Sequence, residues 1–261
     1  MGGFELDIFL PLAALGLIAA FGITPYMKLV TEQTLTQVEL PPLKVALLSA
    51  TQGGVMAILA TAAGLVIAQW AGLGVPNFEK LLSGEALQSD FLSHLTIAAQ
   101  LGLATATIAV LLERFVFWHH LPNAFHQGIR STWWKRALAT SYGAISEELI
   151  VRLFFMSLFA WGLKHAGLEA SGLPSDTAMW IAVVLSALMF GLLHLPSTIM
   201  LAPITKIIVI RTMALNGVIG LAAGWVFWEY GLIAAFVTHW FADIVILVIA
   251  PALILNTDET D

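Results

Sequence analysis

Ionisable side chains recur at helical spacings inside stretches of this chain that otherwise hold almost no charge. The first group is Ser146-Glu-Glu-Leu-Ile-Val-Arg152, the second is His194 alone, and the third is His239 followed four residues later by Asp243. Within an apolar helix such residues usually face a polar interior and act there. A carboxylate beside two imidazoles is typical of a site that activates water.

Helical spacing predicts how the first group divides. Glu148 and Arg152 are four residues apart and therefore share one helix face, where they can neutralise each other. Glu147 lies about 100° around an α-helix from its neighbour and points elsewhere. We therefore expect a structural ion pair between Glu148 and Arg152, with Glu147 left for chemistry.

Two chemistries fit the remaining groups. In the first, Glu147 takes a proton from water as a general base, while a histidine holds that water or donates to a developing oxyanion. In the second, Zn²⁺ lowers the pKa of its own bound water, with Glu147, His194, His239 and Asp243 as the candidate ligands. A polar network that only fixes helix packing is the non-catalytic interpretation.

Other intramembrane chemistries lack their required residues. The sequence contains no H-E-x-x-H string and no cysteine, which excludes paired-histidine metalloproteases, thiolate metal sites and cysteine nucleophiles. Asp243 is the only aspartate inside an expected span, so a twin-aspartate protease is excluded as well. Ser146 and Ser186 lack the glycine frame of a serine nucleophile.

The composition predicts a membrane protein. Charged residues make up 11% of the 261 residues and hydrophobic residues 59%, whereas a soluble domain carries about 25% charged residues. Soluble enzymes and disordered proteins are excluded, and the net charge of −6 argues against a nucleic-acid partner. Residues 1–261 are expected to form a single integral membrane domain.

Helices long enough to span a bilayer need roughly 20 mostly apolar residues. The expected fold is all-α, a polytopic transmembrane helix bundle of about seven spans, or eight if Pro196 divides one of them. The seven stretches are Ile8–Thr24, Val45–Trp70, Phe91–Leu112, Ala137–Leu163, Thr177–Leu195, Ile207–Trp228 and Gly231–Ala250. Residues 137–250 hold all three motifs and form the expected catalytic core.

The basic residues predict the orientation, because cytoplasmic loops carry an excess of lysine and arginine. With seven spans, two basic residues fall on one side, Lys80 and Lys164, and eight on the other. The eight are Lys28, Lys44, Arg114, Arg130, Lys135, Arg136, Lys206 and Arg211. This sorting places the N-terminus outside, the C-terminal segment Asn256–Asp261 in the cytoplasm, and the motif cluster in the cytoplasmic half.

The three motifs, in this order and each in a hydrophobic span, resemble those of the CAAX prenyl protease and bacteriocin-processing family, also called CPBP or Abi. The resemblance implies an intramembrane glutamate-dependent endopeptidase that cuts near the cytoplasmic side. Eukaryotic members of that family remove the last three residues from prenylated Cys-a-a-X proteins. Prokaryotic members have roles in bacteriocin maturation, self-immunity and regulatory proteolysis.

The resemblance also implies roles for the motif residues. Glu147 would activate water, His194 would help to hold it, and His239 with residue 243 would stabilise the oxyanion or complete a metal site. The supporting residues would be Glu148, Arg152 and Phe190, the last as a packing group beside His194. The third motif often ends in asparagine, and Asp243 departs from this; an ionised aspartate donates no hydrogen bond but is a natural Zn²⁺ ligand.

The expected partners are membrane lipid and a membrane-anchored peptide or protein substrate, in the inner or plasma membrane of a prokaryote. Two other functions stay open at this stage. One is a transporter of protons or cations, because intramembrane Glu, His and Asp also suit ion pathways. The other is a non-proteolytic immunity or scaffold protein that uses the same fold.

Overall fold

The computed structural model describes residues 5–34, 40–87, 89–122, 125, 131–199, 201 and 203–251. The elements of the first half are α1 (Leu6–Gly22), α2 (Thr24–Thr34), α3 (Pro42–Trp70), α4 (Pro76–Ser83), α5 (Phe91–Leu112), the π-helix η1 (Glu113–Phe117) and the 3₁₀-helix η2 (Trp118–His120). Those of the second half are α7 (Trp133–Ser141), the π-helices η3 (Tyr142–Glu147) and η4 (Leu149–Met156), α8 (Ser157–His165), strands β1 (Glu169–Ala170) and β2 (Leu173–Pro174), α9 (Asp176–Leu193), α10 (Leu195–Ile199), α11 (Lys206–Tyr230), α12 (Leu232–Asp243) and the π-helix η5 (Ile244–Ile249).

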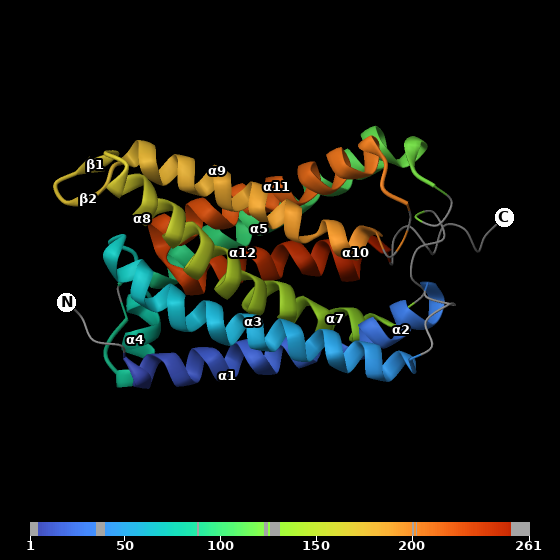
Figure 1. Ribbon diagram of the computed structural model, residues 1–261, viewed down its shortest axis with the longest axis horizontal. Helices are drawn as coiled ribbons and strands as arrows, with labels where there is room; N and C mark the ends of the chain where they lie inside the picture. The colour runs from blue at the N-terminus through green and yellow to red at the C-terminus, as the bar shows by residue number, and fades with distance from the viewer. Residues whose placement is uncertain are drawn as a thin grey trace.

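The long helices run roughly parallel to one axis and pack side by side as a bundle (Figure 1). The helical run from α7 through η3 and η4 to α8 lies between α3 on one side and α9 on the other. Helix α12 packs against η3, against α5 and against α11. The run at residues 133–165 is therefore enclosed by the helices that carry the other two motifs.

Six helices in the described part of the chain are long and apolar enough to cross a membrane. They are Leu6–Thr34, Pro42–Trp70, Phe91–His120, Asp176–Ile199, Lys206–Tyr230 and Leu232–Ile249. The expected all-α polytopic bundle is confirmed. The fourth expected span, 137–163, is helical throughout but is not among the six, and it carries three charged side chains. The number of spans and their orientation stay predictions.

Helix breaks fall where the sequence contains proline or glycine. Helix α9 ends at Leu193, and the chain resumes as α10 at Leu195, just before Pro196. Gly231 alone joins α11 to α12, with a φ of 85° that a side chain rarely adopts. The first break places His194 at the C-terminal end of α9, and the second fixes the antiparallel pairing of α11 with α12.

Basic residues gather at one end of the bundle, as their order in the chain predicts. The end that holds α2, α7 and α10 in Figure 1 also carries the described basic residues of the larger set, namely Lys28, Lys44, Arg114, Lys135, Arg136, Lys206 and Arg211. Lys80 on α4 and Lys164 on α8 lie at the opposite end, beside the β1–β2 hairpin. Arg130 and the C-terminal segment 256–261 lie outside the described residues.

Two glycines let the motif helices approach closely. A Cβ on Gly102 of α5 would collide with the carbonyl oxygen of Thr238, which directly precedes His239 on α12. A Cβ on Gly220 of α11 would lie 3.0 Å from Cα of Ala187 on α9. Small residues at such crossings allow backbone-to-backbone packing where lipid provides no hydrophobic driving force. The positions of α9 and α12 around the site therefore depend on these contacts.

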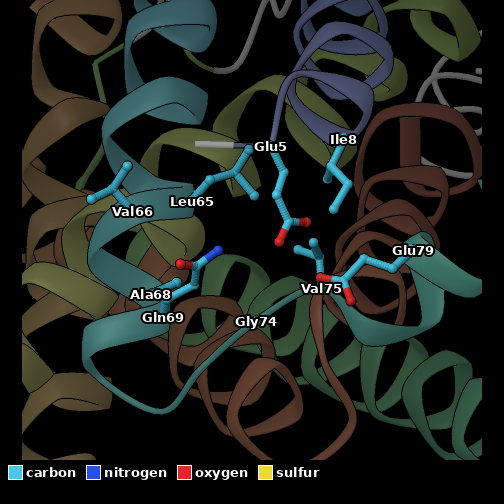
Figure 2. A pocket seen from close by; sticks show the side chains of 9 residues that line it. All are labelled: Glu5, Ile8, Leu65, Val66, Ala68, Gln69, Gly74, Val75 and Glu79. Atoms are coloured by element: carbon cyan, nitrogen blue, oxygen red, sulfur yellow. The ribbon is translucent and has the colours of Figure 1, made fainter. Parts of the chain in front are cut away.

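A small cavity of about 20 Å³ lies at the end of the bundle that carries α4 (Figure 2). Its lining includes the carboxylates of Glu5 and Glu79 and the amide of Gln69, and Figure 2 shows the Glu5 carboxylate pointing into it. Burial raises the pKa of the Glu79 carboxyl above its usual 4.5, and the negative charge of Glu5 raises it further.

Glu79→Gln is therefore expected to stabilise the protein slightly at neutral pH. A carboxyl whose pKa is higher in the folded than in the unfolded state favours folding when protonated, so its ionisation makes stability fall as pH rises through that window. The apparent melting temperature in detergent should exceed that of the wild type at pH 7, and the difference should shrink as pH falls to 4. Glu85→Gln, outside the cavity, is the control. An equal difference at both pH values would contradict the ionisation account.

Candidate active site

Glu147 and Glu148 lie where two π-helices meet. η3 ends at Glu147, η4 begins at Leu149, and Glu148 stands between them. A π-helix bonds residue i to residue i+5 and so winds more residues into each turn than an α-helix does. Consecutive side chains are therefore separated by a smaller angle around the axis, which brings the two glutamates closer to the same side.

Both glutamates approach His239, and this corrects the division that α-helical spacing predicts. The expected ion pair is confirmed, because Arg152 Nε donates to Glu148 Oε2 at 3.1 Å with both side chains fully buried. Glu148 is also engaged with the imidazole, since its Oε1 lies 2.9 Å from His239 Nδ1. On the other side of the ring, Glu147 Oε2 lies 3.9 Å from Nε2. Glu148 is thus both a partner of Arg152 and the carboxylate that orients His239.

His194 faces Glu147 from α9. Its Nδ1 lies 2.9 Å from the carbonyl oxygen of Phe190, one turn earlier, and its Nε2 lies 3.8 Å from Glu147 Oε2. A carbonyl oxygen only accepts hydrogen bonds, so Nδ1 carries the proton and neutral Nε2 presents a lone pair. The hydrogen bond to Glu148 assigns the same tautomer to His239. The Nε2 atoms of both histidines therefore face Glu147.

Asp243 completes the cluster one turn after His239. Its Oδ1 lies 3.6 Å from His239 Nε2, so this nitrogen faces two carboxylates, those of Glu147 and Asp243. The side chains of Glu147 and His194 keep 19% and 29% of their surface exposed, whereas His239 keeps 3%. The cluster is therefore partly open on the side of Glu147 and His194, while His239 forms its buried wall.

Gly143 lies on η3 one turn before Glu147 and leaves the space that Asp243 occupies. A Cβ there would collide with Asp243 Oδ2 and would lie 3.2 Å from His239 Nε2. Any side chain at this position would therefore enter the cluster itself. The sequence reasoning missed this residue, although a glycine one turn before the first glutamate is a visible signal.

Phe190 packs between the two histidines and the buried arginine. Its ring meets the imidazole of His194 edge-on at 4.5 Å and that of His239 at 5.3 Å between centroids. The guanidinium carbon of Arg152 lies 5.6 Å from the centre of the same ring. The packing role that the motif predicts is thus extended to three members of the site. Ser186, one turn before Phe190, is fully buried and accepts a hydrogen bond from Arg152 Nη1 at 3.0 Å.

Two imidazoles and two carboxylates are common ligands of Zn²⁺. The distances between their facing nitrogen and oxygen atoms are, however, long for a shared zinc ion. Two ligands of one tetrahedral Zn²⁺ are separated by about 3.3 Å at ordinary bond lengths, whereas the contacts around Nε2 and Glu147 are 3.6 to 3.9 Å. Within the described ranges, no group of three or more His, Asp or Glu side chains is arranged to hold a metal ion. The chemistry proposed below therefore uses only the residues of the chain.

Other polar residues of the spans serve packing. Asn216 donates to the carbonyl of Thr212 on its own helix at 2.8 Å. His94 stacks on Tyr230 at 4.4 Å near the end opposite the basic residues. Arg211 binds both carboxylate oxygens of Glu113 at 2.7 and 2.8 Å, which joins α11 to η1.

Comparison with known proteins gives one match. Residues 129–245 match the family described as Rce1-like, type II CAAX prenyl endopeptidase. This range contains all three motifs, and the resemblance to the CAAX prenyl protease family is confirmed. No match was found among curated proteins or among solved structures. The matched family is one of proteases, which supports a peptide hydrolase in an integral membrane protein.

Proposed function

Because residues 129–245 match the Rce1-like CAAX prenyl endopeptidase family, we propose that this protein is an intramembrane endopeptidase in which Glu147 activates water. The observation that carries the proposal is the position of Glu147 Oε2, 3.8 Å from His194 Nε2 and 3.9 Å from His239 Nε2. These separations are too long for direct hydrogen bonds and suit a bridging water.

The water would be polarised by acceptors on two sides. One hydrogen would be donated to Glu147 and the other to Nε2 of His194, whose Nδ1–H is committed to the carbonyl of Phe190. The water oxygen then attacks the carbonyl carbon of the scissile bond, and its proton passes to Glu147. When the tetrahedral intermediate collapses, the C–N bond breaks and Glu147 returns this proton to the leaving nitrogen.

The oxyanion needs a hydrogen-bond donor, and an ionised aspartate supplies none. We assign this role to the His239 imidazolium, whose Nε2–H would face the reaction centre. Asp243, 3.6 Å from that nitrogen, would offset the imidazolium charge. Asp243 would therefore support the donor, which accounts for an aspartate at the position where the family often has asparagine.

The substrate would be a membrane-anchored peptide or a CAAX-like C-terminal segment, cleaved near the cytoplasmic face. His194 lies at the C-terminal end of α9, toward the end of the bundle that carries most of the described basic residues. By the positive-inside rule this end is cytoplasmic. The proposal also keeps two expectations from the sequence. The protein would lie in the inner or plasma membrane of a prokaryote, and residues 1–261 would form one membrane domain.

Glu147→Gln is expected to lower cleavage of a lipid-anchored peptide by on the order of 10²–10⁴-fold, the usual contribution of a general base. The measurement is the rate of product formation by purified protein in proteoliposomes, with the cut site located by mass spectrometry. Glu229→Gln, the same change on an exposed part of α11, should keep full activity. Equal melting temperatures would show that the loss is chemical.

Equal cleavage by wild type and Glu147→Gln would overturn the assigned base. Cation or proton flux without any cleavage would instead favour the transport alternative.

A further inference from the structure

A continuous chain of buried hydrogen bonds leads from α9 to the imidazole of His239. Ser186 Oγ accepts from Arg152 Nη1 at 3.0 Å, and Arg152 Nε donates to Glu148 Oε2 at 3.1 Å. Glu148 Oε1 then accepts from His239 Nδ1 at 2.9 Å. Ser186, Arg152 and Glu148 are fully buried and His239 is almost so. The chain thus links three helical segments without access to solvent.

The hydroxyl of Ser186 is oriented so that it can accept the hydrogen bond from Arg152. Its proton is donated to the carbonyl oxygen of Val183 at 2.9 Å, which leaves the Oγ lone pairs to accept from the arginine. Arg152 is otherwise short of partners, because Nη2 is buried and has no hydrogen-bond partner among the described residues. Among the described residues, Ser186 is therefore the only side chain that accepts a hydrogen bond from a terminal nitrogen of this guanidinium.

The arrangement of Arg152 on Glu148 is a one-point contact that could become a two-point contact. A guanidinium binds a carboxylate most strongly through two parallel hydrogen bonds. The side-on form of this contact uses Nε and Nη2, as Arg211 does on Glu113. In Arg152 only Nε contacts Glu148, and Nη2 has no hydrogen-bond partner among the described residues, while Nη1 is held by Ser186. The second carboxylate oxygen, Oε1, is thereby kept for His239.

From this competition we infer that Ser186 is a positioning residue for the active site. By holding Arg152 Nη1 on α9, it keeps the guanidinium from turning so that Nε and Nη2 take both oxygens of Glu148. It thereby preserves the bond that holds His239 with Nδ1 protonated and Nε2 toward Glu147. The catalytic consequence rests on the proposed function. The effect on the imidazole does not depend on the proposed function, and it can be measured without a substrate.

Ser186→Ala tests the inference through the state of the imidazole. In protein labelled with ¹⁵N-histidine, the His239 signals, assigned by their loss in His239→Gln, should report Nδ1–H bonded to a carboxylate in the wild type. In Ser186→Ala these signals should shift and broaden as the ring loses its fixed hydrogen bond to Glu148. Ser186→Cys is a second variant that keeps the volume and replaces the hydroxyl by a weak donor and acceptor, and it should shift in the same direction.

Ser146→Ala is the matched control. Ser146 is equally buried, and its hydroxyl donates to the carbonyl of Gly16 at 2.8 Å, outside the chain that leads to His239. Ser146→Ala removes one buried hydrogen bond and Ser186→Ala removes two, so both changes should lower stability. Only the substitutions of Ser186 should move the His239 signals. In an assay with a cleavable peptide they should also lower kcat on the order of tenfold with KM unchanged.

Unaltered His239 signals in both Ser186 variants would overturn the inference, even if activity fell. Altered signals in a protein that cleaves no peptide would support it and would separately count against the proposed function.

Discussion

Arg152→Met is expected to lower the apparent melting temperature by on the order of 10 °C. The change removes the partner of a fully buried carboxylate, Glu148, and leaves its charge balanced only by a hydrogen bond from His239. Breaking a buried ion pair from one side costs about 3–5 kcal/mol, which corresponds to that order of shift in a chain of this size. The measurement is the loss of helical circular dichroism on heating in detergent.

A second substitution identifies the uncompensated charge as the cause. In Glu148→Gln/Arg152→Met the buried position becomes neutral, while the glutamine oxygen can still accept from His239. The double variant should therefore recover more than half of the lost stability. If it is no more stable than Arg152→Met alone, lost packing and not lost charge pairing explains the effect.

Arg211→Met is the matched control for that experiment. Arg211 also binds a single glutamate, Glu113, and it does so through two hydrogen bonds. Its pair is partly exposed, with 19% and 22% of the two side chains accessible, so the stranded carboxylate can be hydrated. We expect a shift of a few degrees at most, because partly exposed pairs contribute about 1 kcal/mol or less.

Gly143→Ala is expected to reduce peptide cleavage on the order of 10²-fold while leaving the fold nearly as stable as before. The new methyl group would meet Asp243 Oδ2 and lie 3.2 Å from His239 Nε2. The carboxylate tip of Asp243 can rotate away at small cost, so the strain falls on the cluster and not on the backbone. Displacing reacting groups by about 1 Å typically costs about 10²-fold in rate.

Gly162→Ala provides the comparison within the same helical run. No atom lies within 4 Å of a Cβ built on Gly162, which belongs to α8. Replacing this glycine should keep activity and should stabilise the helix by up to about 1 kcal/mol. The two alanine variants therefore make one chemical change with opposite consequences. Full activity in Gly143→Ala would show that the space beside Asp243 is not needed for catalysis.

Much of the architecture follows from the sequence because membrane insertion is governed by apolar length. Six of the expected spans overlap helices that can cross a membrane. Four agree within a few residues at both ends, whereas the first continues to Thr34 and the third to His120. The break at His194 and the one-residue turn at Gly231 follow from proline and glycine chemistry, which acts locally. The fourth span departs from this pattern, because the charges that mark the site also make its helix less apolar.

The residues that form the cluster were also predictable. Ionisable side chains are unfavourable in lipid, so those that occur inside a span usually belong to a functional site. Glu147, His194, His239 and Asp243 do come together, with separations of 3.6 to 3.9 Å between facing atoms. Their division of labour was harder to predict. Spacing in an ideal α-helix assigns Glu148 to Arg152 alone, and the π-helical winding of η3 and η4 brings Glu148 to His239 as well.

The sequence by itself determined an all-α membrane bundle, the order of its spans and the identity of its polar cluster, because these depend on composition and on contacts between near neighbours in the chain. Only the tertiary structure decided which atoms face one another. The hydrogen bond from Arg152 to Ser186 joins residues 34 apart, and that from His239 to Glu148 joins residues 91 apart. The role of Gly143 likewise exists only because α12 packs against η3. Such contacts depend on the relative depth and rotation of packed helices, which local sequence patterns do not encode.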